Sequence, residues 1–216
     1  AKAVLFEQLA KAARAGKRKY AVAYGQDPWM TLIARQPGLP LVTFGMTENC
    51  NVYATDVSCT QQGSSWLMHS QEGTWPVQTN LFGHHNVLNV LAAMSALSVA
   101  GLRMEEVSPH CKSLNAPAGR LEPVENDLGF SILIDYAHTP DALAQVCRTL
   151  KALGPRRLIV VFGAGGNRDR TKRPLMAQAV QQQADLAVIT SDNPRYESPE
   201  AICEDIQLGF SDTFPF

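Results

Sequence analysis

The chain has 216 residues, of which 45% are apolar and 18% are charged, and its formal net charge is −1. This length allows a sizeable core in one or two domains, while the balanced charge gives no overall attraction to nucleic acid or to an acidic membrane. Five scattered cysteines without a C-x-x-C pair, and no apolar run near the roughly 20 residues that cross a bilayer, predict a cytoplasmic protein without disulfides, structural zinc or membrane partners.

The first half of the chain predicts one helix, a series of short strands and a second, longer helix. Val4, Leu5, Leu9 and Ala13 have helical spacing, and no capping residue precedes them, so we expect the chain to be cut from something longer. Strands are predicted over 19–25, 39–45, 51–57, 64–70 and 74–80, the last two forming a hairpin. The second helix, 85–101, has its apolar stripe at Val87, Val90, Leu91, Met94 and Leu97 and ends at Gly101.

The composition changes near residues 114–116, which predicts a boundary between domains 1–114 and 115–216. Beyond it, strands over 131–135, 157–163 and 186–190 alternate with helices over 139–153, 174–183 and 198–209, two of them capped by Thr139 and Ser198. Alternation of this kind predicts an α/β fold whose mostly parallel sheet is covered on both faces. Ligands of such sheets bind beyond the carboxyl ends of the strands, at the loops after Ile134, Phe162 and Thr190.

The first two of these loops carry residues suited to a ligand. Asp135 ends an apolar strand, where a carboxylate commonly accepts hydrogen bonds from ligand hydroxyls. The second loop, "GAGGNRDRTKR", combines glycines with Arg168, Arg170, Lys172 and Arg173, a pattern typical of an anion site. It is neither a dinucleotide fingerprint nor a G-x-x-x-x-G-K-[ST] phosphate loop. A solvated basic loop is the alternative, which fits Arg170 and Arg173 in particular.

The third loop, "SDNPR", places Asp192, Asn193, Pro194 and Arg195 directly after a buried strand. Judged by spacing alone, it is most simply a turn. Its charges also suit the zwitterionic end of an amino acid, because Arg195 has the fork that binds a carboxylate and Asp192 can pair with an ammonium group.

Taken in order, eight segments of the chain resemble the Mur ligases, and among them the MurE type. The matching segments span nearly the whole chain and read AKAVLF, GHHNVLNVLAA, AGRLEPV, DYAHTPDAL, VFGAGGNRDRTKRPLM, AD at 184–185, SDNPR and EDIQLGF. The resemblance implies the second half of a central ATPase domain followed by a Rossmann-like C-terminal domain. It also implies an ATP- and Mg²⁺-dependent ligase that adds meso-diaminopimelate to UDP-N-acetylmuramoyl-L-Ala-D-Glu in bacterial cell-wall synthesis, acting as a monomer.

The resemblance assigns roles to particular residues. Asn86 and Asn89, with His85 beside them, match the residues that meet adenine, and Arg120 and Asp135 match those that meet the phosphates and the ribose. The diaminopimelate site is matched by Arg168 and by Asp192, Asn193, Pro194 and Arg195. Ligases that add L-lysine lack the arginine that ends this tetrapeptide, so Arg195 favours diaminopimelate.

The chain also departs from the family pattern. The family's G-K-T phosphate loop, metal-binding acids, modified lysine and final GKGHE-like segment have no match here, so we expect this chain to be inactive alone. Asn167 stands where an acid is more usual, beside the amino-acid site, and "YGQDP" replaces an Asn-x-Asp-Asp pattern. The alternatives left open are a ligase that adds L-lysine and a non-catalytic binding module of the same fold.

Overall fold

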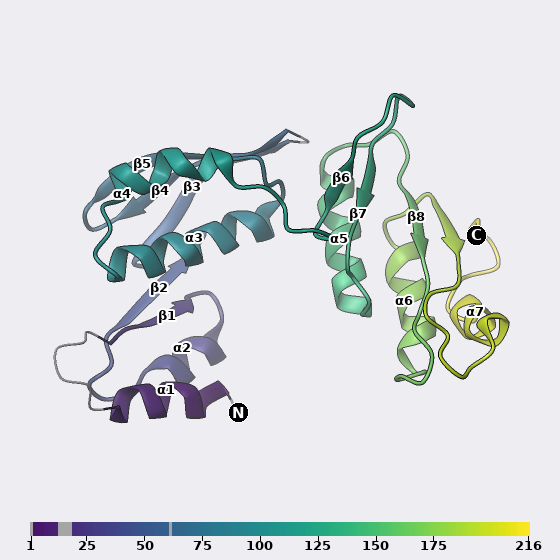
Figure 1. The fold of residues 1–216 in the computed structure, drawn as a ribbon, viewed down its shortest axis with the longest axis horizontal. Coiled ribbons are helices and arrows are strands. Elements are labelled where there is room, and N and C mark those ends of the chain that lie inside the picture. The colour runs from purple at the N-terminus through teal and green to yellow at the C-terminus, as the bar shows by residue number, and fades with distance from the viewer. Residues whose placement is uncertain (1, 13–18, 61) are drawn as a thin grey trace. The chain divides into compact units, whose positions relative to one another are not determined.

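The computed structural model describes residues 2–12, 19–60 and 62–216, which form two compact units, 1–115 and 116–216 (Figure 1). The sequence predicted a helical stripe from Val4 to Ala13, and Ala13 lies outside the described residues. Among the described residues, the first unit has one five-stranded sheet and the second unit has two two-stranded sheets, and each unit has its own set of packed helices.

The first unit contains a five-stranded sheet in the order β1-β2-β3-β4-β5. Strands β1 to β3 are parallel, and β3, β4 and β5 are antiparallel. The predicted hairpin is confirmed, because Ser70 of β4 pairs with Gly73 of β5. The bounds of the strands are β1 Ala21–Tyr24, β2 Leu41–Gly45, β3 Val52–Thr60, β4 Gly63–Ser70 and β5 Gly73–Thr79.

Helix α3 (His84–Val99) packs on this sheet through the predicted stripe. Val87, Val90, Leu91 and Met94 are buried as expected, whereas Leu97 is half-buried and Ser95 completes the buried face. Gly101, with φ of 95°, follows the end of the helix. The other helices of this unit are α1 (Lys2–Lys11), α2 (Pro28–Ala34), α4 (Met104–Val107) and the 3₁₀ helix η1 (Ser108–Ser113).

Helix α2 was not predicted, although the sequence carries its start signal. The Asp27 carboxylate accepts hydrogen bonds from the backbone N–H groups of Trp29 and Met30 at 2.9 and 3.2 Å, and Pro28 is the first helical residue. An acid followed by proline is a common helix start, but the helix has only seven residues. The segment YGQDP, which stands in place of the family's Asn-x-Asp-Asp pattern, therefore has a structural role as the start of α2.

The second unit contains the predicted βα series. Strands β8 (Ile159–Phe162) and β9 (Leu186–Ile189) pair in parallel, while β6 (Glu122–Val124) and β7 (Ile132–Ile134) form an antiparallel ribbon. Helices α5 (Pro140–Ala152) and α7 (Pro199–Gln207) begin at Thr139 and Ser198, whose hydroxyls accept a backbone N–H as predicted. Helix α6 (Lys172–Gln181) packs against both other helices.

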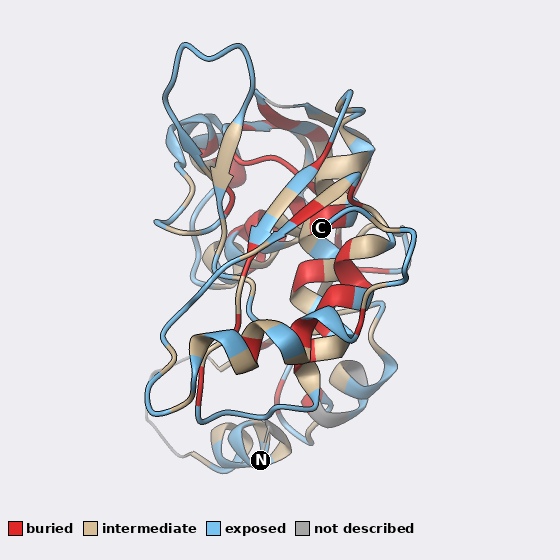
Figure 2. Ribbon diagram, turned by 90° about the vertical axis from the view of Figure 1, so that its right-hand side faces the viewer, coloured by how far each residue is buried: buried red, intermediate tan, exposed pale blue. Residues whose placement is uncertain are grey.

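The core of the second unit lies between these helices and one face of β8 and β9 (Figure 2). Phe162, Ala187, Met176 and Ile206 are among its buried residues. The expectation that both faces of these strands are covered is wrong for the described residues. On the other face the residues Ile159, Val161 and Val188 are 48%, 64% and 43% exposed.

Candidate functional site

The glycine-rich loop after β8 and the SDNPR loop after β9 pack backbone against backbone. Because the two strands are parallel, both loops leave the same edge of the sheet, and Thr190 donates a backbone hydrogen bond of 3.0 Å to the Phe162 carbonyl. Gly166 donates another, of 2.9 Å, to the Asn193 carbonyl. A β-carbon on Gly166 would lie 1.8 Å from the Pro194 carbonyl oxygen, so only glycine allows this approach.

Arg195 and Asp192 both lie beside Gly165. A β-carbon built there would be 3.2 Å from Arg195 Nη1 and 4.0 Å from Asp192 Oδ2. The Arg195 guanidinium donates a hydrogen bond to the Gly166 carbonyl, and its backbone lies in the left-handed region with φ of 52°. A cationic fork and a carboxylate thus share one exposed spot, as binding of a zwitterion requires.

Asn167 connects the two loops, and Arg168 follows it. The Asn167 side-chain oxygen accepts the Tyr196 backbone N–H at 3.0 Å, and the φ of Asn167 is 51°, a conformation that asparagine tolerates better than most residues. Arg168 is exposed, and within the described parts of the chain its side chain makes no hydrogen bond or ion pair. The departure from the family at position 167 therefore falls on a residue that holds the loops together.

An ion cluster centred on the buried Arg173 adjoins these loops, and sequence reasoning missed it. Arg173 is 0% exposed, which corrects the interpretation of it as part of a solvated basic loop. Its guanidinium forms a bidentate pair with Glu197, at 2.9 and 3.0 Å, and donates to Asp205 Oδ2 at 2.8 Å. The more exposed Arg170 also pairs with Asp205, at 3.0 Å. We name Arg170, Arg173, Glu197 and Asp205 the arginine cluster.

The arginine cluster predicts a dependence of stability on pH. Hydrogen bonds from Arg173 lower the pKa of Glu197 and the pKa of Asp205, and further donors, the Asn167 N–H and Arg170, add to the effect. Carboxyls with a lowered pKa in the folded state stabilise it above their unfolded pKa, about 4, and the gain is lost as pH falls through the folded values. We expect the urea midpoint of the second unit to be steady from about pH 7 to 5 and to fall below about pH 4.

The matched variant for this measurement is Glu197→Gln combined with Asp205→Asn. This double variant has neither carboxyl group. Its urea midpoint should therefore be lower than that of the unmodified chain at neutral pH, and it should fall less steeply between about pH 4 and 2. If the urea midpoint of the double variant falls as steeply as that of the unmodified chain in this pH interval, other carboxyl groups cause the acid sensitivity.

Asp135 and Arg120 lie together at the start of the second unit. The Asp135 carboxylate accepts the backbone N–H groups of Leu121 at 2.9 Å and Ala137 at 2.8 Å, which leaves acceptor capacity for a hydroxyl. Arg120 is exposed and its guanidinium lies 5.6 Å above the centre of the Tyr136 ring. Tyr136 was not singled out by the sequence, and it restricts where the Arg120 cation can lie.

Asn86 and Asn89 lie in the first turns of α3 in the first unit. Asn86 donates its side-chain N–H to the Phe82 carbonyl at 3.0 Å and accepts one from Asn89 at 3.3 Å, so the two amides form one hydrogen-bonded pair. His85 is half-buried beside them. Gly83, with φ of 91°, gives the chain its turn into the helix.

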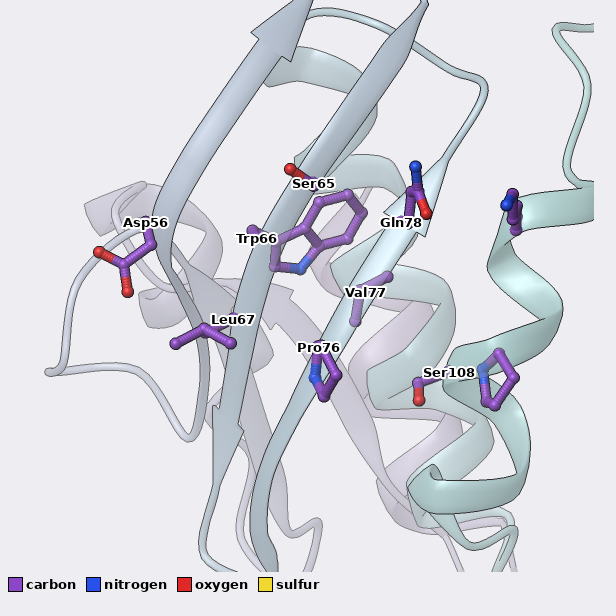
Figure 3. A pocket seen from close by; sticks show the side chains of 10 residues that line it. Asp56, Ser65, Trp66, Leu67, Pro76, Val77, Gln78 and Ser108 are labelled. Atoms are coloured by element: carbon purple, nitrogen blue, oxygen red, sulfur yellow. The ribbon is translucent and has the colours of Figure 1, made fainter.

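A hollow of about 800 Å³ lies elsewhere in the first unit, along β4, β5 and η1 (Figure 3). The described residues that line it include Trp66, Val77, Gln78, Ser108 and Lys112 but none of the predicted site residues. Among the described residues there is no cluster of three or more His, Cys, Asp or Glu side chains arranged for a metal ion. No helix among them is long and apolar enough to span a membrane.

The α/β fold and the paired loops after β8 and β9 are features of one class of protein, and comparison with known families identifies that class. The Mur ligase middle domain matches residues 1–97, and the Mur ligase glutamate ligase domain matches residues 119–214. The chain therefore belongs to the Mur ligase family, as the sequence motifs predicted. A structural likeness to the folylpolyglutamate synthase of Mycobacterium tuberculosis, with a TM-score of 0.75 at 18% identity over 96% of this chain and 47% of that one, supports the fold alone.

Among Mur ligases, this chain is similar to enzymes of the MurE type. It is 37% identical over 98% of its length to the UDP-N-acetylmuramoyl-L-alanyl-D-glutamate–2,6-diaminopimelate ligase of Geobacillus thermodenitrificans, and 38% identical over 96% to that of Geobacter metallireducens. A solved structure of a ligase with this name matches at a TM-score of 0.64 and 37% identity, over 98% of this chain and 43% of that one. The chain spans 43% and 41% of the length of the two curated relatives.

Proposed function

We propose that this chain is part of an ATP-dependent ligase that adds meso-diaminopimelate to UDP-N-acetylmuramoyl-L-Ala-D-Glu. The observation that carries the proposal is the placement of Asp192 and Arg195 beside Gly165, on loops joined by backbone hydrogen bonds. The relatives named for 2,6-diaminopimelate ligation support the same assignment. In the proposed site Arg195 binds the distal carboxylate of diaminopimelate, and Asp192 binds the distal ammonium.

The proposed reaction forms one amide bond at the expense of ATP. The side-chain carboxylate of D-glutamate attacks the γ-phosphorus of ATP, giving an acyl phosphate and ADP. The amine of diaminopimelate then attacks the acyl carbon, and phosphate leaves from the tetrahedral intermediate while the amine loses its proton. Arg168 and the SDNPR loop bind the end of diaminopimelate that does not react, and thereby orient the attacking amine.

Residues that match nucleotide contacts occur in both units, and each is assigned its own role. We assign adenine to Asn86, Asn89 and His85, the phosphates to Arg120 and the ribose hydroxyls to Asp135. The free acceptor capacity of Asp135 and the exposed guanidinium of Arg120 suit these roles. Mg²⁺ supplies charge neutralisation at the phosphates when bound. We place the enzyme in the bacterial cytoplasm, where its ATP and UDP-linked substrates are held, and we propose that it acts as a monomer.

The proposal is tested by NMR titration of the ¹⁵N-labelled chain with meso-diaminopimelate, L-lysine and ATP in separate experiments. We expect meso-diaminopimelate to shift the amide signals of 163–168 and 192–197 and to bind at least about tenfold more tightly than L-lysine, which lacks the second carboxylate. Equal affinities would indicate a ligase for L-lysine or another diamine. Absence of any shift with all three ligands would favour a non-catalytic module.

A further inference from the structure

Glu197 makes contacts that connect every segment carrying the amino-acid site. Its carboxylate accepts the backbone N–H of Asn167 at 2.5 Å, and it forms the bidentate pair with Arg173 at the start of α6. Glu197 lies two residues after Arg195 in the chain. Its bonding partner Asn167 directly precedes Arg168. One carboxylate, two residues away from Arg195 in the chain, is therefore bonded to the residue that precedes Arg168.

Stability alone is a poor explanation for this arrangement. Arg173 is fully buried, and burying a guanidinium carries a desolvation cost that ion pairs often only balance. Its Nε lacks a hydrogen-bond partner among the described residues, so the cost is not fully offset. An apolar residue of similar volume would fill the site at less cost, but it would not hold Glu197 in one orientation.

The contacts instead fix the relative placement of two loops whose own backbones are strained. Asn167 and Arg195 have φ of 51° and 52°, outside the regions that most residues prefer. The bonds that hold Asn167 come from the other loop: Tyr196 N–H donates to Asn167 Oδ1, and Asn167 N–H donates to Glu197. The Arg195 guanidinium in turn donates to the Gly166 carbonyl, so each strained residue is bonded to the opposite loop. Without Glu197, the segment that carries Arg195 loses its connection to Asn167 N–H and to Arg173.

We propose that Glu197, oriented by the buried Arg173, is a positioning residue that sets the separation between Arg168 and Arg195 and thereby selects for a second carboxylate on the incoming amino acid. This inference rests on the proposed function of the site. L-lysine has no distal carboxylate to meet Arg195, so a change in the placement of Arg195 should affect diaminopimelate alone.

The test is Glu197→Gln in the 216-residue chain, with Glu204→Gln on α7 as the matched control. Glutamine keeps an acceptor for the Asn167 N–H but cannot form the charged bidentate pair with Arg173. We expect the Kd for meso-diaminopimelate to rise about tenfold, a usual size for coupling within one network of hydrogen bonds and ion pairs, and the Kd for L-lysine to stay unchanged. Glu204 is exposed, and its replacement should alter neither constant.

A second measurement does not depend on any ligand. The Gly166 and Tyr196 amide protons bond across the two loops, to Asn193 and Asn167, and in Glu197→Gln their hydrogen exchange should become about tenfold faster or more while α5 amides keep their rates. Unchanged exchange, or equal losses of affinity for both amino acids, would overturn the inference. If the unmodified chain binds no amino acid but the exchange effect is present, the proposed function fails and the loop-positioning role of Glu197 stands.

Discussion

Replacing Gly166 by alanine is expected to lower the free energy of unfolding of the second unit by about 3 kcal/mol, the upper end of the usual cost of overpacking. The added carbon would lie 1.8 Å from the Pro194 carbonyl oxygen and 2.6 Å from its carbon. Both are backbone atoms, and Pro194 has little freedom to move away. The two loops must separate, which also breaks the hydrogen bond from Gly166 to Asn193.

Urea unfolding followed by far-ultraviolet circular dichroism measures this loss. All three tryptophans, Trp29, Trp66 and Trp75, belong to the first unit, so their fluorescence monitors a part of the chain that the substitution does not touch. Gly165→Ala is the matched control. Its new carbon would lie 3.2 Å from Arg195 Nη1, the end of a flexible side chain, so its stability should change by less than about 1 kcal/mol. Equal losses for the two variants would contradict the backbone explanation.

Local signals in the sequence predicted much of this fold. Thr139 and Ser198 cap their helices, Gln71 and Glu72 connect a hairpin, and the spacing of Val87 to Met94 defines the buried face of α3. Each depends on residues within a few positions of one another, where propensity and periodicity act directly. The ribbon of β6 and β7 was missed as a pair because β6 has only three residues, and its register with β7 is a property of the folded chain.

The candidate site also has one part that the sequence predicts and one part that it does not. Parallel strands bring the loops after β8 and β9 to one edge of the sheet, so their proximity could be predicted from the βα pattern. The burial of Arg173 could not, because its partners lie 24 and 32 residues further along the chain. In the sequence, Arg173 is one more basic residue in a basic loop. Only packing of α6 against α7 distinguishes it from the exposed Arg168.

Replacing Arg195 by alanine is expected to weaken binding of meso-diaminopimelate by roughly 2 kcal/mol, or about 30-fold in Kd, and to leave the affinity for L-lysine unchanged. The guanidinium is the group proposed to bind the distal carboxylate, and a charged bidentate pair is among the stronger contacts available to a ligand. The substitution also removes the hydrogen bond to the Gly166 carbonyl. Calorimetric titration with each amino acid measures the two constants.

A second variant of Arg195 is needed to separate the loss of the guanidinium from a change in backbone strain. Arg195 has φ of 52°, which alanine adopts at a cost and asparagine adopts more readily, so Arg195→Asn removes the guanidinium with less strain. If the guanidinium binds the carboxylate, both variants lose affinity for meso-diaminopimelate to a similar extent, and Arg195→Lys, which keeps the charge without the fork, recovers only part of it. Arg156→Ala, an exposed arginine at the opposite end of β8, is the control for net charge. If Arg195→Asn instead binds meso-diaminopimelate with full affinity, the weaker binding of Arg195→Ala is due to backbone strain. In that case the Arg195 guanidinium does not bind the substrate.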